Sequence, residues 1–135
     1  MATEIGFIGV GNMGGPMVSN LLEAGYAVRV YDPNKAAVDA CAAKGATTAS
    51  SPKDLADQVE TILVCLPTPA IVESVALGED GIAKGAMVKT YIDLSTTGPQ
   101  TSVPVAEGLK GAGILALDAP VSGGVVGAIS GSLAV

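Results

Sequence analysis

The feature that most constrains this chain is the glycine-rich run Gly9-Val10-Gly11-Asn12-Met13-Gly14 and its place in the sequence. The run follows an apolar, strand-like segment over 4–8 and opens a helix-like segment that reaches about residue 25. A second strand-like segment over 27–31 then ends in an acid, Asp32. Strand, tight glycine turn, helix, strand and carboxylate, in that order, form the fingerprint of a dinucleotide-binding βαβ unit. The sequence therefore predicts a site for a nicotinamide or flavin dinucleotide.

Each glycine of the run has its own expected role. Gly9 allows the sharp turn out of the strand, Gly11 lets a pyrophosphate approach the backbone, and Gly14 lets the helix pack closely on the strand. The free N–H groups of the first helical turn and the helix dipole favour phosphate there. A turn that only packs a helix onto a strand is the alternative, but the acid about 20 residues further on also fits the fingerprint.

Composition narrows the class of protein. With 135 residues, 49% of them hydrophobic, the chain can build one domain with a real core. The net charge of −6 and the lack of a basic cluster argue against a nucleic-acid partner. There is no His, and Cys41 and Cys65 stand alone in apolar surroundings, so we expect two small buried side chains and no metal site. No apolar run approaches the roughly 20 residues of a membrane span and no signal-peptide pattern is present, which predicts a cytoplasmic protein with no membrane partner.

Short strand-like runs alternate with helix-like runs along the whole chain. Strands are expected over 4–8, 27–31, 61–65, 90–94 and 114–117, with a weaker one over 46–48. Several of these runs are continuously apolar, as strands covered on both faces are. The series predicts an α/β fold, a Rossmann-type doubly wound parallel sheet with helices on both faces, forming one dinucleotide-binding domain over 1–135.

Helix starts and the chain end give further expectations. Asp32-Pro33, Ser51-Pro52 and Thr68-Pro69 each place a capping residue before a proline at the first helical position, and Thr97-Gly98-Pro99-Gln100 has capping-box spacing. The segment 130–135 is expected to enter another buried strand and to be cut short there. We therefore expect that the domain stops before its natural end.

Asp32 also bears on the choice of cofactor. A carboxylate at the end of the second strand can accept hydrogen bonds from both ribose hydroxyls of the adenosine and would repel a 2′-phosphate. No Arg follows it, and the nearest cation in the sequence is Lys35. This predicts NAD as the cofactor, with NADP less favoured and Lys35 as the main argument for NADP. Capping of a helix by Asp32 is the alternative, and both roles could hold together.

Two more loops leave strands at their carboxyl ends, where ligands bind in open α/β sheets. One is Leu66-Pro67-Thr68-Pro69 and the other is Leu94-Ser95-Thr96-Thr97. These loops are expected to flank the cofactor. Thr96 is expected to contact it, while Thr68 and Thr97 either contact it or only cap helices.

A last motif, Asp118-Ala119-Pro120-Val121-Ser122-Gly123-Gly124, follows the final expected strand. A Ser followed by two glycines offers one hydroxyl and unshielded backbone N–H groups, which suits a carboxylate. The motif is not the nucleophile elbow, and no His is present to activate Ser122. On the residues alone, a plain strand-to-turn transition stays open.

Taken together, these motifs resemble those of the β-hydroxyacid dehydrogenases, the family of 3-hydroxyisobutyrate dehydrogenase and tartronate semialdehyde reductase. The resemblance covers essentially the whole chain and rests on the segments 6–14, 65–67, 93–96 and 118–124. It implies the following roles. The pyrophosphate would be held by Gly9, Gly11, Asn12, Met13 and Gly14, the ribose by Asp32, the rest of the cofactor by Leu66, Pro67 and Thr96, and the substrate carboxylate by Ser122, Gly123 and Gly124.

The reaction implied by the resemblance is reversible hydride transfer between NAD(P) and the hydroxyl carbon of a small 3-hydroxy acid. The family's general acid/base is a lysine in a GxxGxGxxxKxxN pattern beyond the substrate motif, and its second, all-helical domain closes the site and builds the homo-oligomer. Neither the pattern nor that domain is found in this chain. No catalytic residue is therefore assigned, and the chain alone is expected to bind NAD weakly without turnover.

Other readings of the same motifs stay open. A 6-phosphogluconate dehydrogenase-like enzyme or a glyoxylate or succinic semialdehyde reductase would use NADP, although the former tends to carry Asn-Arg where this chain has Asp32-Pro33. Imine reductases share the fold but replace the lysine. A non-catalytic NAD-binding module is the alternative of another class, and the Ser122-Gly123-Gly124 motif does not favour it.

Overall fold

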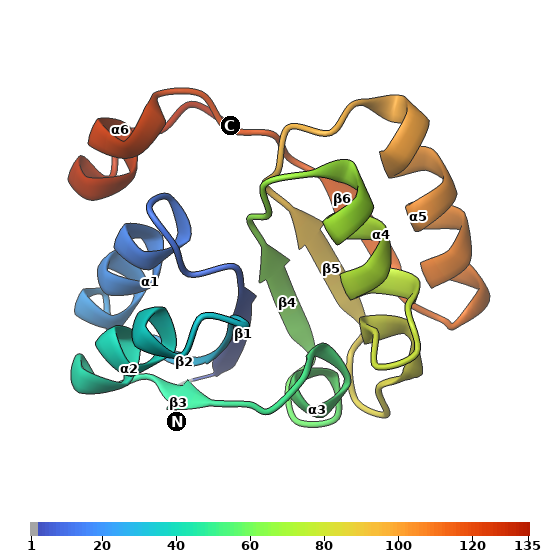
Figure 1. Cartoon of the computed structure of the whole chain (residues 1–135), viewed down its shortest axis with the longest axis horizontal. Helices are drawn as coiled ribbons and strands as arrows, with labels where there is room; N and C mark the ends of the chain where they lie inside the picture. Colours follow the sequence, from blue (N-terminus) through green and yellow to red (C-terminus); the bar gives the residue numbers. More distant parts are fainter. Residues whose placement is uncertain (1–2) are drawn as a thin grey trace.

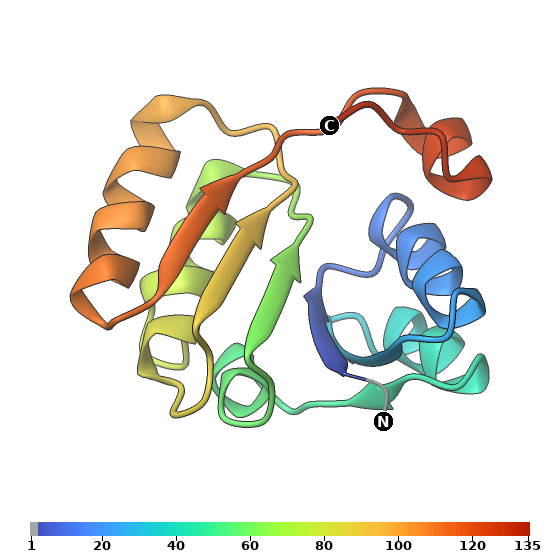
Figure 2. The same cartoon turned by 180° about the vertical axis from the view of Figure 1, so that it is seen from behind.

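A computed structural model describes residues 3–135 as a six-stranded parallel sheet with helices on both faces (Figures 1 and 2). The strands are β1 (Glu4–Ile8), β2 (Ala27–Tyr31), β3 (Thr47–Thr48), β4 (Thr61–Val64), β5 (Thr90–Asp93) and β6 (Leu115–Asp118). The helices are α1 (Gly14–Glu23), α2 (Lys35–Ala43), α3 (Pro52–Ala56), α4 (Pro69–Leu77), the 3₁₀ turn η1 (Ile82–Lys84), α5 (Pro99–Gly111) and α6 (Gly124–Ser130). The predicted fold class is confirmed.

The order of the strands decides where a ligand can bind. The sheet runs β3-β2-β1-β4-β5-β6, so the chain builds outward from β1 in one direction and then from β4 in the other. The loops after β1 and β4 therefore diverge at the carboxyl end of the sheet and leave a crevice between them. This reversal point is where open α/β sheets bind their ligands.

Apolar residues form one cluster on each face of the sheet. Val18 of α1 and Cys41 of α2 pack with Phe7, Val28 and Val30 on one face. The other face carries α3, α4 and α5, whose buried side chains include Leu55, Val72, Ala76, Val105 and Leu109. This two-sided burial explains why the strands are apolar almost throughout.

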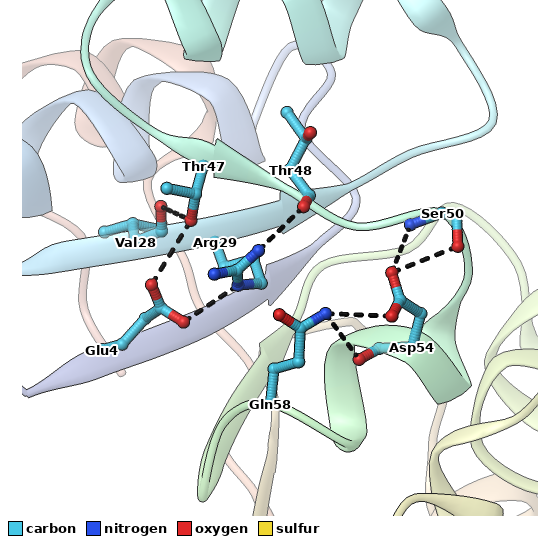
Figure 3. Close-up of polar contacts among 8 residues, drawn as sticks. All are labelled: Glu4, Val28, Arg29, Thr47, Thr48, Ser50, Asp54 and Gln58. Carbon is cyan, nitrogen blue, oxygen red and sulfur yellow. Dashed lines mark hydrogen bonds and ion pairs between the residues drawn. The ribbon is translucent and has the colours of Figure 1, made fainter.

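Polar contacts join β1, β2 and β3, and further contacts hold the start of α3 (Figure 3). Arg29 on β2 donates through Nε to Glu4 Oε1 at 2.9 Å and through a terminal nitrogen to the Thr48 carbonyl at 3.0 Å. Nearby, Asp54 Oδ2 accepts from the N–H of Ser50 at 2.8 Å. Because β3 has only two residues, these contacts supplement a short ladder at the sheet edge.

The helix starts agree with the sequence in part. Ser51 and Thr68 cap α3 and α4 as predicted, each followed by Pro at the first helical position. The prediction that Asp32 caps the next helix is wrong, because α2 begins at Lys35 and is capped by Asn34. Thr97 is not a cap either, since Gly98, with φ +79°, takes that place before α5.

The end of the chain differs from the expectation. A short helix, α6, lies against α1, where Asn20 Nδ2 donates to the Ala128 carbonyl at 2.8 Å. The expected buried strand over 130–135 is wrong for this structure. Ala134 forms only an isolated antiparallel bridge with Ser122, and Val135 is 84% exposed. None of the helices in residues 3–135 is both long enough and apolar enough to span a membrane.

Candidate functional site

The crevice at the carboxyl ends of β1, β2 and β4 contains a pocket of about 410 Å³. Every residue predicted to contact the cofactor except Thr96 lines it: Gly9, Gly11, Asn12, Met13, Gly14, Asp32, Leu66 and Pro67. Pro33, Cys65 and Ile71 complete the lining. The structure thus brings together segments from three strand ends that are far apart in the sequence.

Backbone geometry around the turn explains two of its glycines. Gly9 has φ +92°, and a Cβ at this position would overlap the carbonyl oxygen of Cys65. A Cβ at Gly14 would overlap the carbonyl oxygen of Gly9. Both positions must therefore be glycine for the turn, α1 and β4 to approach one another this closely.

Gly11 differs, because a Cβ there would meet no atom within 4 Å. The residue is exposed and lines the pocket, so the free protein does not need a glycine at this position for packing. What a side chain at Gly11 would fill is the space beside the backbone where the fingerprint places a pyrophosphate.

Unpaired donors face the same space. Gly15 donates to the Gly11 carbonyl at 2.9 Å, and the α1 ladder continues from there. Within residues 3–135, the N–H groups of residues 11–14 donate to no protein acceptor. These groups and the positive end of the α1 dipole suit a phosphate, so the turn fits a dinucleotide on its own geometry.

Asp32 is held in place by two backbone N–H groups. Its Oδ2 accepts from Val10 at 3.0 Å and its Oδ1 accepts from Asn34 at 2.8 Å. The carboxylate therefore bridges the glycine turn and the start of α2, which explains why it does not cap that helix. Each oxygen keeps a further lone pair for a ligand hydroxyl. Lys35 points its Nζ at Asp39 Oδ2, 2.8 Å away.

A buried polar network, which the sequence did not suggest, fixes the loop after β4. Leu66 donates its N–H to Ser95 Oγ at 2.8 Å, and Ser95 donates its own N–H to Asp93 Oδ1 at 2.8 Å. Burial raises the pKa of the Asp93 carboxyl. Burial, with a smaller contribution from the Asp93 charge, also raises the pKa of the Cys65 thiol. Cys65 is only half-buried and lines the pocket, so the expectation of a fully buried side chain is confirmed for Cys41 alone.

The motif predicted to hold a carboxylate lies outside this pocket. Ser122, Gly123 and Gly124 are all exposed, and α6 begins at Gly124. The Ser122 N–H is already used, because it donates to the Ala134 carbonyl at 2.7 Å. The N–H groups of Gly123 and Gly124 donate to no acceptor within the described residues. Thr96 is exposed after β5 and also does not line the pocket.

No three His, Cys, Asp or Glu side chains of residues 3–135 are grouped so that they could hold a metal ion. The arrangement is instead that of a crevice with phosphate-facing N–H groups and one fixed carboxylate.

Comparison with known proteins shows which family this chain belongs to. Residues 4–135 match the family model described as the NAD binding domain of 6-phosphogluconate dehydrogenase. The chain belongs to this family. It is therefore an NAD(P)-binding domain, and the crevice is its expected cofactor site.

Two relatives of this NAD(P)-binding domain carry the name of a dehydrogenase. A 3-hydroxyisobutyrate dehydrogenase from Pseudomonas aeruginosa is 46% identical over 132 residues, which is 97% of this chain and 44% of the relative. A solved 3-hydroxyisobutyrate dehydrogenase from Mycobacterium tuberculosis with L-serine superposes with a TM-score of 0.89 at 37% identity, over 98% of this chain and 45% of that one. This chain thus spans less than half the length of these relatives.

A further solved relative was determined with NADP⁺ bound. Psf3 in complex with NADP⁺ and 2-OPP superposes with a TM-score of 0.87 at 28% identity, over 96% of this chain and 46% of that one. Membership of the family therefore leaves the choice between NAD and NADP to the residues of the site.

Proposed function

We propose that this domain binds NAD as the cofactor half of a dehydrogenase acting on a small 3-hydroxy acid of the 3-hydroxyisobutyrate or tartronate semialdehyde type. The observation that carries the proposal is the pocket itself, in which the glycine turn, the Asp32 carboxylate and the Leu66-Pro67 loop face one another. The named relatives support the class of reaction. When bound, the nicotinamide ring supplies the chemistry by accepting or giving a hydride.

The residues of the chain bind and orient in this proposal. The N–H groups of residues 11–14 would hold the pyrophosphate beside Gly11. Asp32 would accept hydrogen bonds from the adenosine ribose. Leu66 and Pro67 would cover the cofactor from the β4 side, and Thr96 would contact it beyond the pocket. Ser122, Gly123 and Gly124 would bind the substrate carboxylate, because the N–H groups of Gly123 and Gly124 have no acceptor within the described residues.

Hydride transfer also needs a group that exchanges the hydroxyl proton of the substrate. We assign no residue of this chain to that step. The cysteine thiol at the pocket, Cys65, has a pKa raised by burial, which does not suit it as a base. We therefore expect that this chain binds the dinucleotide without turnover, and that the lysine and the helical, oligomer-forming domain implied by the family lie outside 1–135.

The geometry around Asp32 favours NAD over NADP. The carboxylate is fixed by Val10 and Asn34, so it cannot swing away from a 2′-phosphate without losing two hydrogen bonds. Lys35, the cation that could favour NADP, already pairs with Asp39. The NADP⁺ complex of Psf3 keeps a 6-phosphogluconate dehydrogenase-like or semialdehyde reductase function as the second candidate.

Calorimetric titration with NAD and NADP at matched ionic strength tests the proposal. Wild-type chain should bind NAD at least about tenfold more tightly, because a charged hydrogen-bond acceptor contributes about 1.5–3 kcal/mol. Asp32→Asn should weaken NAD binding and reduce that preference. Asp80→Asn makes the same change in charge at an exposed residue outside the pocket and should leave the preference within about twofold.

Tighter binding of NADP by the wild-type chain would favour the second candidate. Binding of neither nucleotide would reject a dinucleotide site in this chain. Location in the cytoplasm and a homo-oligomeric parent stay predictions.

A further inference from the structure

Two polar side chains at the end of β5 are almost completely buried. Asp93 is 2% exposed and Ser95 is 3% exposed, beside the apolar cluster that contains Tyr91. Burying a carboxylate is costly unless hydrogen bonds compensate for the lost water. The partners of these two side chains therefore show what this arrangement stabilises.

The hydrogen bonds run from β5 toward the pocket. Asp93 Oδ1 accepts from the Ser95 N–H at 2.8 Å, and Asp93 Oδ2 accepts from the Tyr91 hydroxyl at 3.4 Å. The first bond fixes the Ser95 backbone where the strand ends. Ser95 Oγ then accepts from the Leu66 N–H at 2.8 Å.

Leu66 needs this partner because its strand has already ended. The last ladder bonds around β4 are donated by Cys65 to the Ile8 carbonyl at 3.0 Å and by Leu94 to the Val64 carbonyl at 2.9 Å. Beyond them the chain leaves the sheet, and Ser95 replaces the missing neighbour for the next N–H group. Without Ser95, a partly buried donor would be left unpaired.

On its other side Leu66 meets the glycine turn. Leu66 Cδ2 would lie 3.1 Å from a Cβ at Gly9, and the preceding carbonyl, that of Cys65, approaches Gly9 so closely that no side chain fits. Leu66 is thus held between the glycine turn and Ser95, and with Pro67 it forms the pocket wall opposite Asp32.

We propose that Asp93 and Ser95 are positioning residues for the dinucleotide pocket, which set the place of its Leu66-Pro67 wall through the Leu66 N–H. Neither side chain lines the pocket, so in this proposal they influence it through Leu66. The inference rests on the proposed function only in naming the ligand as a dinucleotide; the hydrogen bonds are properties of the free protein.

Ser95→Ala with Ser51→Ala as control tests the inference. Ser51 Oγ accepts from the Asp54 N–H at 2.9 Å, so both variants remove a serine oxygen from a backbone N–H group, but Ser51 lies at α3, outside the pocket. Ser95→Ala should weaken NAD binding about tenfold and speed hydrogen exchange at the Leu66 amide about tenfold. Ser51→Ala should leave both within about twofold.

Two further measurements keep the test decisive if a variant folds poorly. In the wild-type chain, the Leu66 amide should exchange at least about tenfold more slowly than the Thr68 amide, which has no acceptor within the described residues. Asp93→Asn keeps an oxygen for the Ser95 N–H and should lose far less NAD affinity than Asp93→Ala, which removes it.

The outcomes separate the two proposals. If the wild-type chain binds no dinucleotide, the proposed function fails. If it binds NAD and Ser95→Ala binds NAD equally well, or if Leu66 and Thr68 exchange alike, the positioning role is overturned. Equal losses in Asp93→Asn and Asp93→Ala would overturn the part assigned to Asp93.

Discussion

At the scale of single residues, Gly11 and Gly14 separate ligand binding from folding. A methyl group at Gly11 would meet no atom within 4 Å, and its φ lies outside the left-handed region, so Gly11→Ala should change the free energy of unfolding by less than about 1 kcal/mol. The same methyl would occupy pyrophosphate space, so NAD binding should weaken about tenfold or more. Urea unfolding and calorimetric titration of the variant measure the two effects.

Gly14→Ala is the matched comparison. Its methyl would overlap the Gly9 carbonyl oxygen, so the turn must open, and unfolding should become easier by about 1–3 kcal/mol. NAD binding by Gly14→Ala should also weaken, but in this variant the loss of binding accompanies a loss of stability. If Gly11→Ala lost as much stability as Gly14→Ala, the space beside Gly11 would not be free in the folded chain.

The role of a residue could be predicted where nearby residues in the sequence determine it. It could not be predicted where a contact between distant strands determines it. The spacing of Gly9, Gly11 and Gly14 with Asp32 after the next strand predicted the part of the pocket lining that these residues form. The bond from Leu66 to Ser95 joins residues 29 positions apart, and the local sequence does not identify Leu66 as the partner. A polar residue at both the end of a strand and two positions further on was the only signal present.

At the scale of elements, the helix caps give a paired prediction. Thr68 Oγ1 accepts from the Ile71 N–H at 3.2 Å, so Thr68→Ala should lower the free energy of unfolding by about 1 kcal/mol. Thr97 Oγ1 is buried without a hydrogen-bond partner within the described residues, so Thr97→Val should be neutral or stabilising. Denaturant titration checks both, and a loss of about 1 kcal/mol in Thr97→Val would show that its hydroxyl does cap α5.

Elements were predictable where the cap and the apolar pattern agree, as at α3 and α4. The start of α2 was misplaced because Asp32 is used by Val10 and Asn34, a tertiary demand that outweighs its capping preference. The helix α6 was not predicted at all. Its sequence, Gly-Val-Val-Gly-Ala-Ile-Ser, has low helix propensity, and its contacts with α1 hold it in place.

At the scale of the whole molecule, the two faces of the sheet are covered unequally. Seen from behind, no helix lies over β5 and β6 (Figure 2). Leu115 and Leu117 of β6 are 62% and 47% exposed on this edge strand. The pocket lies away from this bare edge, at the carboxyl ends of β1, β2 and β4 near the centre of the sheet.

The buried carboxyl of Asp93 should leave its mark on the stability of the whole molecule. Burial raises the pKa of Asp93 above its ordinary value of 3.8, so the folded chain keeps this proton to higher pH than the unfolded chain does. The stabilising contribution is therefore fully present below pH 3.8 and is lost as pH rises through the folded-state pKa. The contribution of Asp54 to stability depends on pH in the opposite direction. A hydrogen bond from the Ser50 backbone lowers the pKa of Asp54, so its stabilising contribution is lost as pH falls.

Urea unfolding of wild type, Asp93→Asn and Asp54→Asn at a series of pH values between about 3 and 8 tests this assignment. The stability of wild type minus that of Asp93→Asn should fall as pH rises, by about 1.4 kcal/mol for each unit by which burial raises the pKa. Wild type minus Asp54→Asn should rise instead. Because each difference cancels the groups that the two proteins share, a flat profile for wild type minus Asp93→Asn would contradict a raised pKa of Asp93. It would mean that the hydrogen bonds from Ser95 and Tyr91, which lower this pKa, offset the effect of burial.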